Sequence, residues 1–127
     1  MVVRISSLTV RIAGTLALLL GLLFWSITEP EGLIPVHTLL GILVVLGVLV
    51  LGVLGLTAPG GNKGMAVAGI VVAILLVIVG FGQRSWLSHP GDPHWLIQVL
   101  HLVVALATIG LGEGIARGLR AARPAAA

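Results

Sequence analysis

The sequence contains no cysteine and few charged residues, and each absence excludes whole classes of protein. Without cysteine the chain has no disulfide, no thiolate metal site, no iron–sulfur cluster and no covalently attached c-type haem. Only 9% of the 127 residues are charged and 58% are hydrophobic, whereas soluble domains carry about 25% charged residues. The formal net charge is +3, from seven Lys and Arg against four Asp and Glu, so nothing indicates nucleic-acid binding. The composition predicts an integral membrane protein.

Four apolar stretches are long enough to cross a bilayer, which takes about 20 residues per helix. We expect spanning helices over residues 12–27, 33–56, 65–81 and 94–115, separated by the turn-rich segments TEPEG, TAPGGNKG and GQRSWLSHPGDP. The apolar run after Arg4 has no small-residue cleavage site, so we interpret it as a retained span and not a signal peptide. The predicted fold is an all-α, four-helix membrane bundle over residues 1–118, followed by a flexible cytoplasmic tail over 119–127.

Basic residues are distributed unevenly between the two ends of this predicted bundle. One end carries Arg4, Arg11, Lys63, Arg117, Arg120 and Arg123. The other end carries only Arg84, beside Glu29, Glu31 and Asp92. Because cytoplasmic loops are enriched in Lys and Arg, this distribution predicts a multi-pass cell-membrane protein with both termini in the cytoplasm. We also expect Trp25, Trp86 and Trp95 to lie near the outer interface.

One face of the fourth predicted helix is polar or small, whereas the rest is Leu, Ile and Val. This face carries His94, Gln98, His101, Ala105, Thr108 and Gly112. Because polar groups are costly in hydrocarbon, we expect it to point into the bundle. The other predicted helices offer small or polar faces of their own: Gly14, Ala17, Gly21 and Trp25; His37, Gly41, Gly52 and Gly55; and Gly69, Ala73 and Gly80. Small residues of this kind indicate either close helix packing or room for a flat ligand.

His37 and His101 are the two histidines expected on inward faces of different helices within one half of the membrane. Two imidazoles on facing helices suit the two axial positions of a haem iron, so we predict a haem b site with these residues as iron ligands. Gly41 and Ala105, one turn away from each histidine, would leave space for the ring. We also expect His101 to lie deeper in the membrane than His37, by about 9 Å of helical rise.

Other interpretations of these histidines stay open. They could hydrogen-bond across helices, line a proton path, or bind zinc together with His94, although zinc prefers three or four converging ligands. His94 is a second candidate for haem contact, either as the iron ligand that pairs with His37 or as a partner of a haem propionate. Arg84 is a further candidate for binding a propionate. We expect His89 to be solvated and Glu113 to pair with Arg117 one turn along the same helix.

Two segments resemble a known family of membrane enzymes. VHTLLGILVVLGVLVLGVLG and PHWLIQVLHLVVALATIGL are similar to the second and fourth helices of one half of the heme A synthase family, and the whole chain resembles a single four-helix half, as in its compact archaeal variants. The resemblance implies haem ligation by His37 and His101. It also implies an oxidase that converts a haem methyl group to a formyl group, with Glu31 or Glu29 as the catalytic carboxylate.

The predicted function is therefore one-electron transfer by a membrane haem protein, with the haem-modifying oxidase and a non-haem structural subunit as alternatives. The expected partners are membrane lipid and haem, with a quinone or another redox protein as electron donor or acceptor. No segment defines a quinone site. The glycine-lined helices also make a homo-oligomer conceivable, and no nucleic-acid partner is expected.

Overall fold

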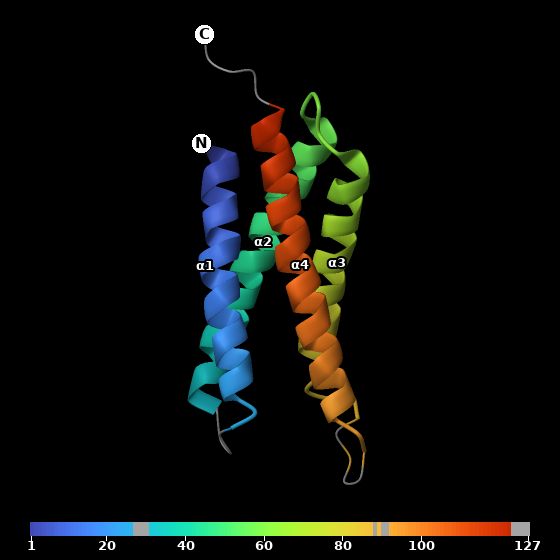
Figure 1. Ribbon diagram of the computed structural model, residues 1–127. Helices are drawn as coiled ribbons and strands as arrows, with labels where there is room; N and C mark the ends of the chain where they lie inside the picture. The colour runs from blue at the N-terminus through green and yellow to red at the C-terminus, as the bar shows by residue number, and fades with distance from the viewer. Residues whose placement is uncertain (27–30, 88, 90–91, 123–127) are drawn as a thin grey trace.

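The computed structural model describes residues 1–26, 31–87, 89 and 92–122, and these residues form an all-α bundle. Its helices are α1 (Val2–Leu23), α2 (Ile34–Thr57), α3 (Lys63–Gly82) and α4 (Trp95–Ala121), with a short 3₁₀ helix, η1 (Glu31–Leu33), before α2. The four long helices run alternately up and down (Figure 1). We call the end where α1 begins and α4 ends the terminal end, and the opposite end the loop end.

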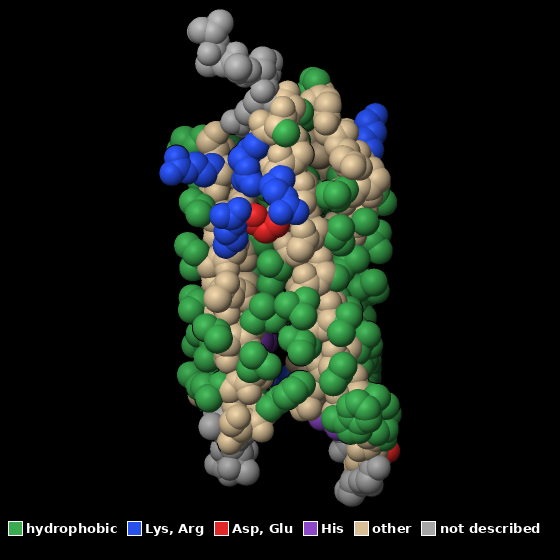
Figure 2. All heavy atoms as spheres, viewed as in Figure 1, with side chains coloured by type: hydrophobic (Ala, Val, Ile, Leu, Met, Phe, Trp, Pro, Cys, Tyr) green, Lys and Arg blue, Asp and Glu red, His purple; other side chains and the backbone are tan. Residues whose placement is uncertain are grey.

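All four long helices are long and apolar enough to cross a membrane, which agrees with the predicted fold class. Large hydrophobic side chains cover the outside of the bundle, and basic side chains gather at its terminal end (Figure 2). Trp25, Trp86 and Trp95 are exposed, and all three flank the loop ends of helices. An exposed apolar belt between polar ends is the surface that a bilayer stabilises.

Two helices extend beyond the apolar stretches that predicted them. α1 begins at Val2, ten residues before the expected start, and α4 continues to Ala121. Residues 119–121, expected in the tail, therefore belong to α4, and Leu119 is buried against the core. Hydropathy marks only the part of a helix that lies in hydrocarbon, whereas packing between α1 and α4 keeps their polar ends helical. Ile27 and residues 123–127 lie outside the described residues.

The helices pack most closely in the half of the bundle near the terminal end. The core there is formed by Val10, Val48 and Leu51, which are completely buried, together with Ala116. Glycines on α2, α3 and α4 face side chains so closely that a methyl group would collide with them; these are Gly47, Gly52, Gly55, Gly69 and Gly112. Most of the small residues therefore serve close helix packing in this half.

Local signals set the ends of α2 and α3. Pro35 occupies the first turn of α2, where a missing N–H costs nothing. Asn62 caps α3, its Oδ1 atom accepting a hydrogen bond of 3.0 Å from the Met65 N–H. Gly60, with φ of 74°, supplies the left-handed residue in the turn between the two helices. This short connection holds α2 and α3 antiparallel (Figure 1).

The expected pairing of Glu113 with Arg117 is wrong. Glu113 instead accepts hydrogen bonds from α1, at 2.6 Å from Arg11 Nη2 and 2.9 Å from Ser7 Oγ. The one-turn spacing on α4 was a valid local signal, but it ignored α1, which brings two donors against the same carboxylate. Contacts between helices therefore replaced the contact expected within α4.

Candidate cofactor site

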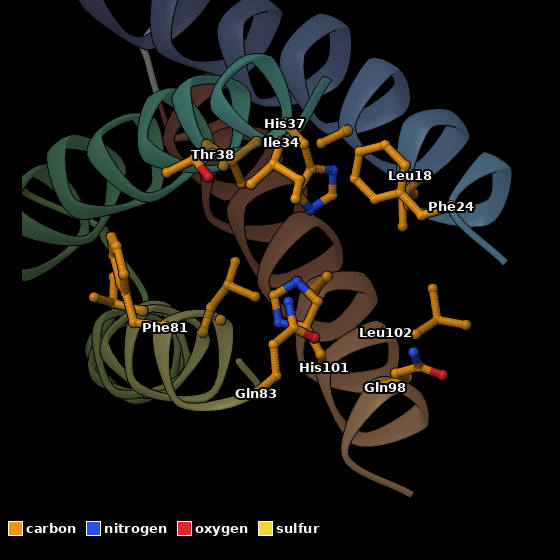
Figure 3. Close-up of a pocket in the computed structure, with 18 of the residues that line it drawn as sticks. Leu18, Phe24, Ile34, His37, Thr38, Phe81, Gln83, Gln98, His101 and Leu102 are labelled. Atoms are coloured by element: carbon orange, nitrogen blue, oxygen red, sulfur yellow. The ribbon is translucent and has the colours of Figure 1, made fainter. Parts of the chain in front are cut away.

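The loop-end half of the bundle encloses a cavity of about 420 Å³. All four long helices contribute to its lining, including Ala17 and Gly21 of α1, His37 and Gly41 of α2, Gly80 of α3, and His101 and Ala105 of α4. Figure 3 shows the side chains of this lining around an open centre. Its volume is within the range of about 300–1,000 Å³ typical of small-molecule and cofactor sites. The helices that pack tightly near the terminal end thus separate around a cavity near the loop end.

His37 and His101 face one another across this cavity (Figure 3). Their ring centroids are 6.2 Å apart, and the ring planes are tilted by 53°. The expected depth difference of about 9 Å is too large. His37 lies three residues after the start of α2 and His101 six after the start of α4, and the predicted spans 33–56 and 94–115 give the same offset of three residues. Three residues correspond to about 4.5 Å of helical rise. The two side chains bridge that offset, which answers the main geometric objection to their pairing.

Each of the two imidazoles has a buried nitrogen without a partner. Nδ1 of His37 and Nδ1 of His101 are both buried and make no hydrogen bond in the structure. Buried polar atoms without a partner are uncommon in proteins, and each costs about 1–3 kcal/mol. Each ring therefore has one buried nitrogen that a further group could satisfy.

The spacing of the rings fits two ligands on opposite sides of one metal atom. At a metal–nitrogen distance of about 2.0 Å, typical of imidazole ligands, the centres of two opposed imidazoles lie about 6 Å apart. The ring centroids of His37 and His101 lie 6.2 Å apart, close to that value. A methyl group built at Gly41 would meet no atom within 4 Å, so open space adjoins His37 along α2. The residues present thus fit a flat macrocycle held between α2 and α4.

The predicted inward face of α4 is confirmed along its length. Thr108 is completely buried and donates a 2.8 Å hydrogen bond to the Val104 carbonyl, and Gly112 is also buried. Toward the loop end, Gln98, His101 and Ala105 of the same face line the cavity. One helix face therefore packs in the terminal half and lines the cavity in the other half.

The remaining predicted site residues lie around the same cavity, with one exception. Gly41, Ala105, His94 and Arg84 all contribute to its lining. His94 sits at the start of α4, and its Nδ1 lies 3.2 Å from the carbonyl oxygens of both Trp86 and Leu87. One ring nitrogen of His94 is thus engaged by the loop backbone. Glu31 belongs to η1, three residues before α2, but its side chain lies outside the described part of the structure.

Loop residues beside the cavity follow the expectations in part. His89 is exposed and lies next to Asp92, whose carboxylate accepts a 3.1 Å hydrogen bond from the His89 N–H. This agrees with a solvated loop histidine. Glu29, the other candidate for the catalytic carboxylate, lies outside the described residues.

Phe24 is a cavity residue that the sequence interpretation missed. Its ring packs against His37, with centroids 5.4 Å apart, and it lines the cavity. Phe24 lies just after the end of α1, three residues beyond Gly21. At that spacing it falls on the face of α1 that carries Gly14, Ala17 and Gly21. Trp25, which the sequence placed on that face, also lines the cavity, so Phe24 is an addition to the predicted set.

A zinc site formed by His37, His94 and His101 receives no support from the geometry. Within residues 1–26, 31–87, 89 and 92–122, no three His, Asp or Glu side chains converge closely enough to hold a metal ion. Zinc in proteins is held by three or four converging side chains. Only the pair of His37 and His101 is brought together.

No protein-family model matches this chain, and neither a curated protein nor a solved structure matches it. Its function is therefore argued from the site itself.

Proposed function

We propose that this chain is a membrane-embedded haem b protein in which His37 and His101 would hold the iron. The observation that carries the proposal is the pair of imidazoles facing one another across a cavity, 6.2 Å apart, each with a buried and unpartnered nitrogen. Two facing histidines on helices of a bundle are a recurrent means of holding haem in proteins. Electron transfer is the function that follows best, since both axial positions would be taken by protein.

The four long helices would each contribute differently to haem binding. α2 and α4 supply the ligands, and Gly41 and Ala105 leave room beside them. Arg84 and His94 lie on the lining near the loop end, where a guanidinium and an imidazole suit the carboxylates of a haem edge. When bound, the haem supplies a reversible one-electron couple. The apolar lining from α1 and α3 would keep water away from it and so favour the less charged form.

The position of the cavity relative to the basic residues predicts where the haem would lie in a membrane. The basic residues of the described chain, apart from Arg84, lie at the terminal end, and the cavity lies toward the loop end. By the positive-inside rule, both termini would be cytoplasmic and the cavity would lie in the outer half of the cell membrane. A quinone or a redox protein could then exchange electrons with the haem near the outer surface.

A second function is favoured by the positions of the two histidines. They come from the second and fourth long helices of a four-helix unit, which is the arrangement that the resemblance to one half of heme A synthase implies. In this alternative haem O is the substrate, and Glu31 is the candidate catalytic carboxylate. Expression in a host that makes haem O distinguishes the two functions, because accumulation of haem A or its hydroxylated precursor would favour the enzyme.

The visible absorption spectrum of the purified protein tests the haem proposal. We expect a sharp Soret band with the low-spin features of bis-histidine haem, either as isolated or after addition of hemin. His37→Ala and His101→Ala should each abolish the low-spin spectrum, whereas His89→Ala, in the exposed loop, should leave it unchanged. A folded protein that stays colourless with hemin would overturn the proposal, and an unchanged His101→Ala spectrum would overturn the ligand assignment.

A further inference from the structure

A second polar site lies at the terminal end, far from the cavity, where α1 and α4 pack together. Arg4, Ser7 and Arg11 follow one another on α1 at spacings of three and four residues, and Glu113, Arg117 and Arg120 do so on α4 at four and three. Such spacings place each set on one face of its helix. Figure 2 shows basic side chains gathered around an acidic one at this end. We call these six residues the arginine seam.

Hydrogen bonds between the two helices fix the centre of the seam. Ser7 donates to Glu113 at 2.9 Å and accepts a hydrogen bond of 3.3 Å from Arg120. Arg11 donates to the other carboxylate oxygen of Glu113 at 2.6 Å. Both oxygens of the single carboxylate are therefore used within the seam. Glu113 thus holds Arg11 directly, and Ser7 links Glu113 to Arg120.

Positive charge in the seam exceeds what Glu113 can neutralise. Four guanidinium groups face one carboxylate, so the seam has a formal net charge of +3. Arg4 and Arg117 make no side-chain hydrogen bond or ion pair within the described part of the chain. All four arginines are exposed. Exposed guanidinium groups on adjacent helices form a strong binding site for phosphate, which they can hold with paired hydrogen bonds.

The level of the seam in the membrane indicates where the phosphate would come from. Arg11 directly precedes the apolar stretch of α1, and Arg4 lies seven residues, or about 10 Å, farther toward the terminal end. The headgroup region is about 5–8 Å deep on each side of the hydrocarbon, so the seam extends from its inner edge at Arg11 to just beyond its outer edge at Arg4. Exposed apolar side chains such as Leu8 and Ile12 adjoin the arginines on α1. Acyl chains would cover these, which free phosphate in solution cannot do.

We infer that the arginine seam binds the phosphate headgroup of an anionic phospholipid in the leaflet at the terminal end of the bundle. Glu113 and Ser7 position Arg11 and Arg120, while Arg4 and Arg117 are left to meet the phosphate. The lipid would join α1 to α4 at the end opposite the cavity. This inference is independent of whether the cavity binds haem.

Native mass spectrometry of the full chain in neutral detergent tests the seam. Phosphatidylglycerol and phosphatidylcholine with the same acyl chains are offered separately, and phosphatidylglycerol should be retained preferentially. Arg117→Gln should weaken its retention about fivefold, the worth of one cationic side chain at a charged membrane surface. Lys63→Gln is the matched control, since Lys63 is also exposed at the terminal end but begins α3, and retention should stay as in the unaltered protein. Glu113→Gln, which removes the carboxylate of the seam, should increase retention.

Three outcomes overturn the inference. The first is equal retention of the two lipids. The second is an equal loss in Arg117→Gln and Lys63→Gln, which would indicate general attraction by positive charge. The third is complete displacement of phosphatidylglycerol by inorganic phosphate, which would identify the seam as a site for free phosphate and not for a lipid.

Discussion

Gly80 on α3 lies directly against the ring of His101 on α4. A Cβ atom at Gly80 would be 3.1 Å from His101 Cε1 and 3.6 Å from Nδ1. The backbone of α3 therefore forms the wall behind this imidazole, although α3 contributes no histidine. The absence of a side chain at Gly80 allows the ring to sit where it faces His37.

Gly80→Ala should disturb haem binding through His101 alone. The added methyl group would push the ring by a few tenths of an ångström and change its direction toward His37. We expect hemin affinity, measured by absorbance titration, to fall about tenfold, which corresponds to about 1.4 kcal/mol. Gly110→Ala is the matched control on α4, because a Cβ there meets no atom within 4 Å. If Gly80→Ala and Gly110→Ala bind hemin with the same affinity, the close approach of the α3 backbone at Gly80 does not position His101.

His94→Ala should keep the bis-histidine spectrum. The ring of His94 is engaged at 3.2 Å by two carbonyl oxygens of the loop, and the observed geometry pairs His37 with His101 instead. We expect hemin affinity to fall by no more than about threefold, through loosening of the loop. If instead the low-spin spectrum disappears in His94→Ala and persists in His101→Ala, the two histidines have exchanged roles.

Ser7→Ala should destabilise the contact between α1 and α4. Ser7 is buried and joins Glu113 to Arg120, and a hydrogen bond of this kind contributes about 1 kcal/mol. The free energy of unfolding in mixed detergent micelles is the quantity to measure. Ser6→Ala is the control, since Ser6 is also buried on α1 but is outside the seam. The prediction is contradicted if both variants lose the same stability.

Gly112→Val should weaken the tightly packed half of the bundle. A Cβ at Gly112 already lies 2.8 Å from Val48 Cγ2, so a larger side chain must separate α2 from α4. Overpacking of this kind costs about 1–3 kcal/mol. Gly118→Val, where a Cβ meets nothing within 4 Å, is the control for the loss of glycine and the gain of a β-branched residue. Unfolding in detergent should be easier for the first variant only.

The number and type of helices followed from the sequence because hydropathy and helical periodicity are local properties. Four apolar stretches gave four helices, and the stripe that includes Thr108 and Gly112 faced inward because polar and small groups avoid lipid. The candidate cavity residues on α4 followed from the same stripe. These conclusions required no knowledge of how the helices are placed relative to one another.

Only the tertiary structure decided which residues meet. The sequence predicted that His37 and His101 lie on inward faces, and only the packing of α2 against α4 brought their ring centroids to 6.2 Å. The packing of α1 against α4 gave Glu113 the partners Ser7 and Arg11 in place of Arg117. The same arrangement divided the small residues, so that Gly112 packs against Val48 while Gly41 borders open space. Offsets between helices depend on loops, tilts and all the packed side chains together, and no local pattern of residues contains that information.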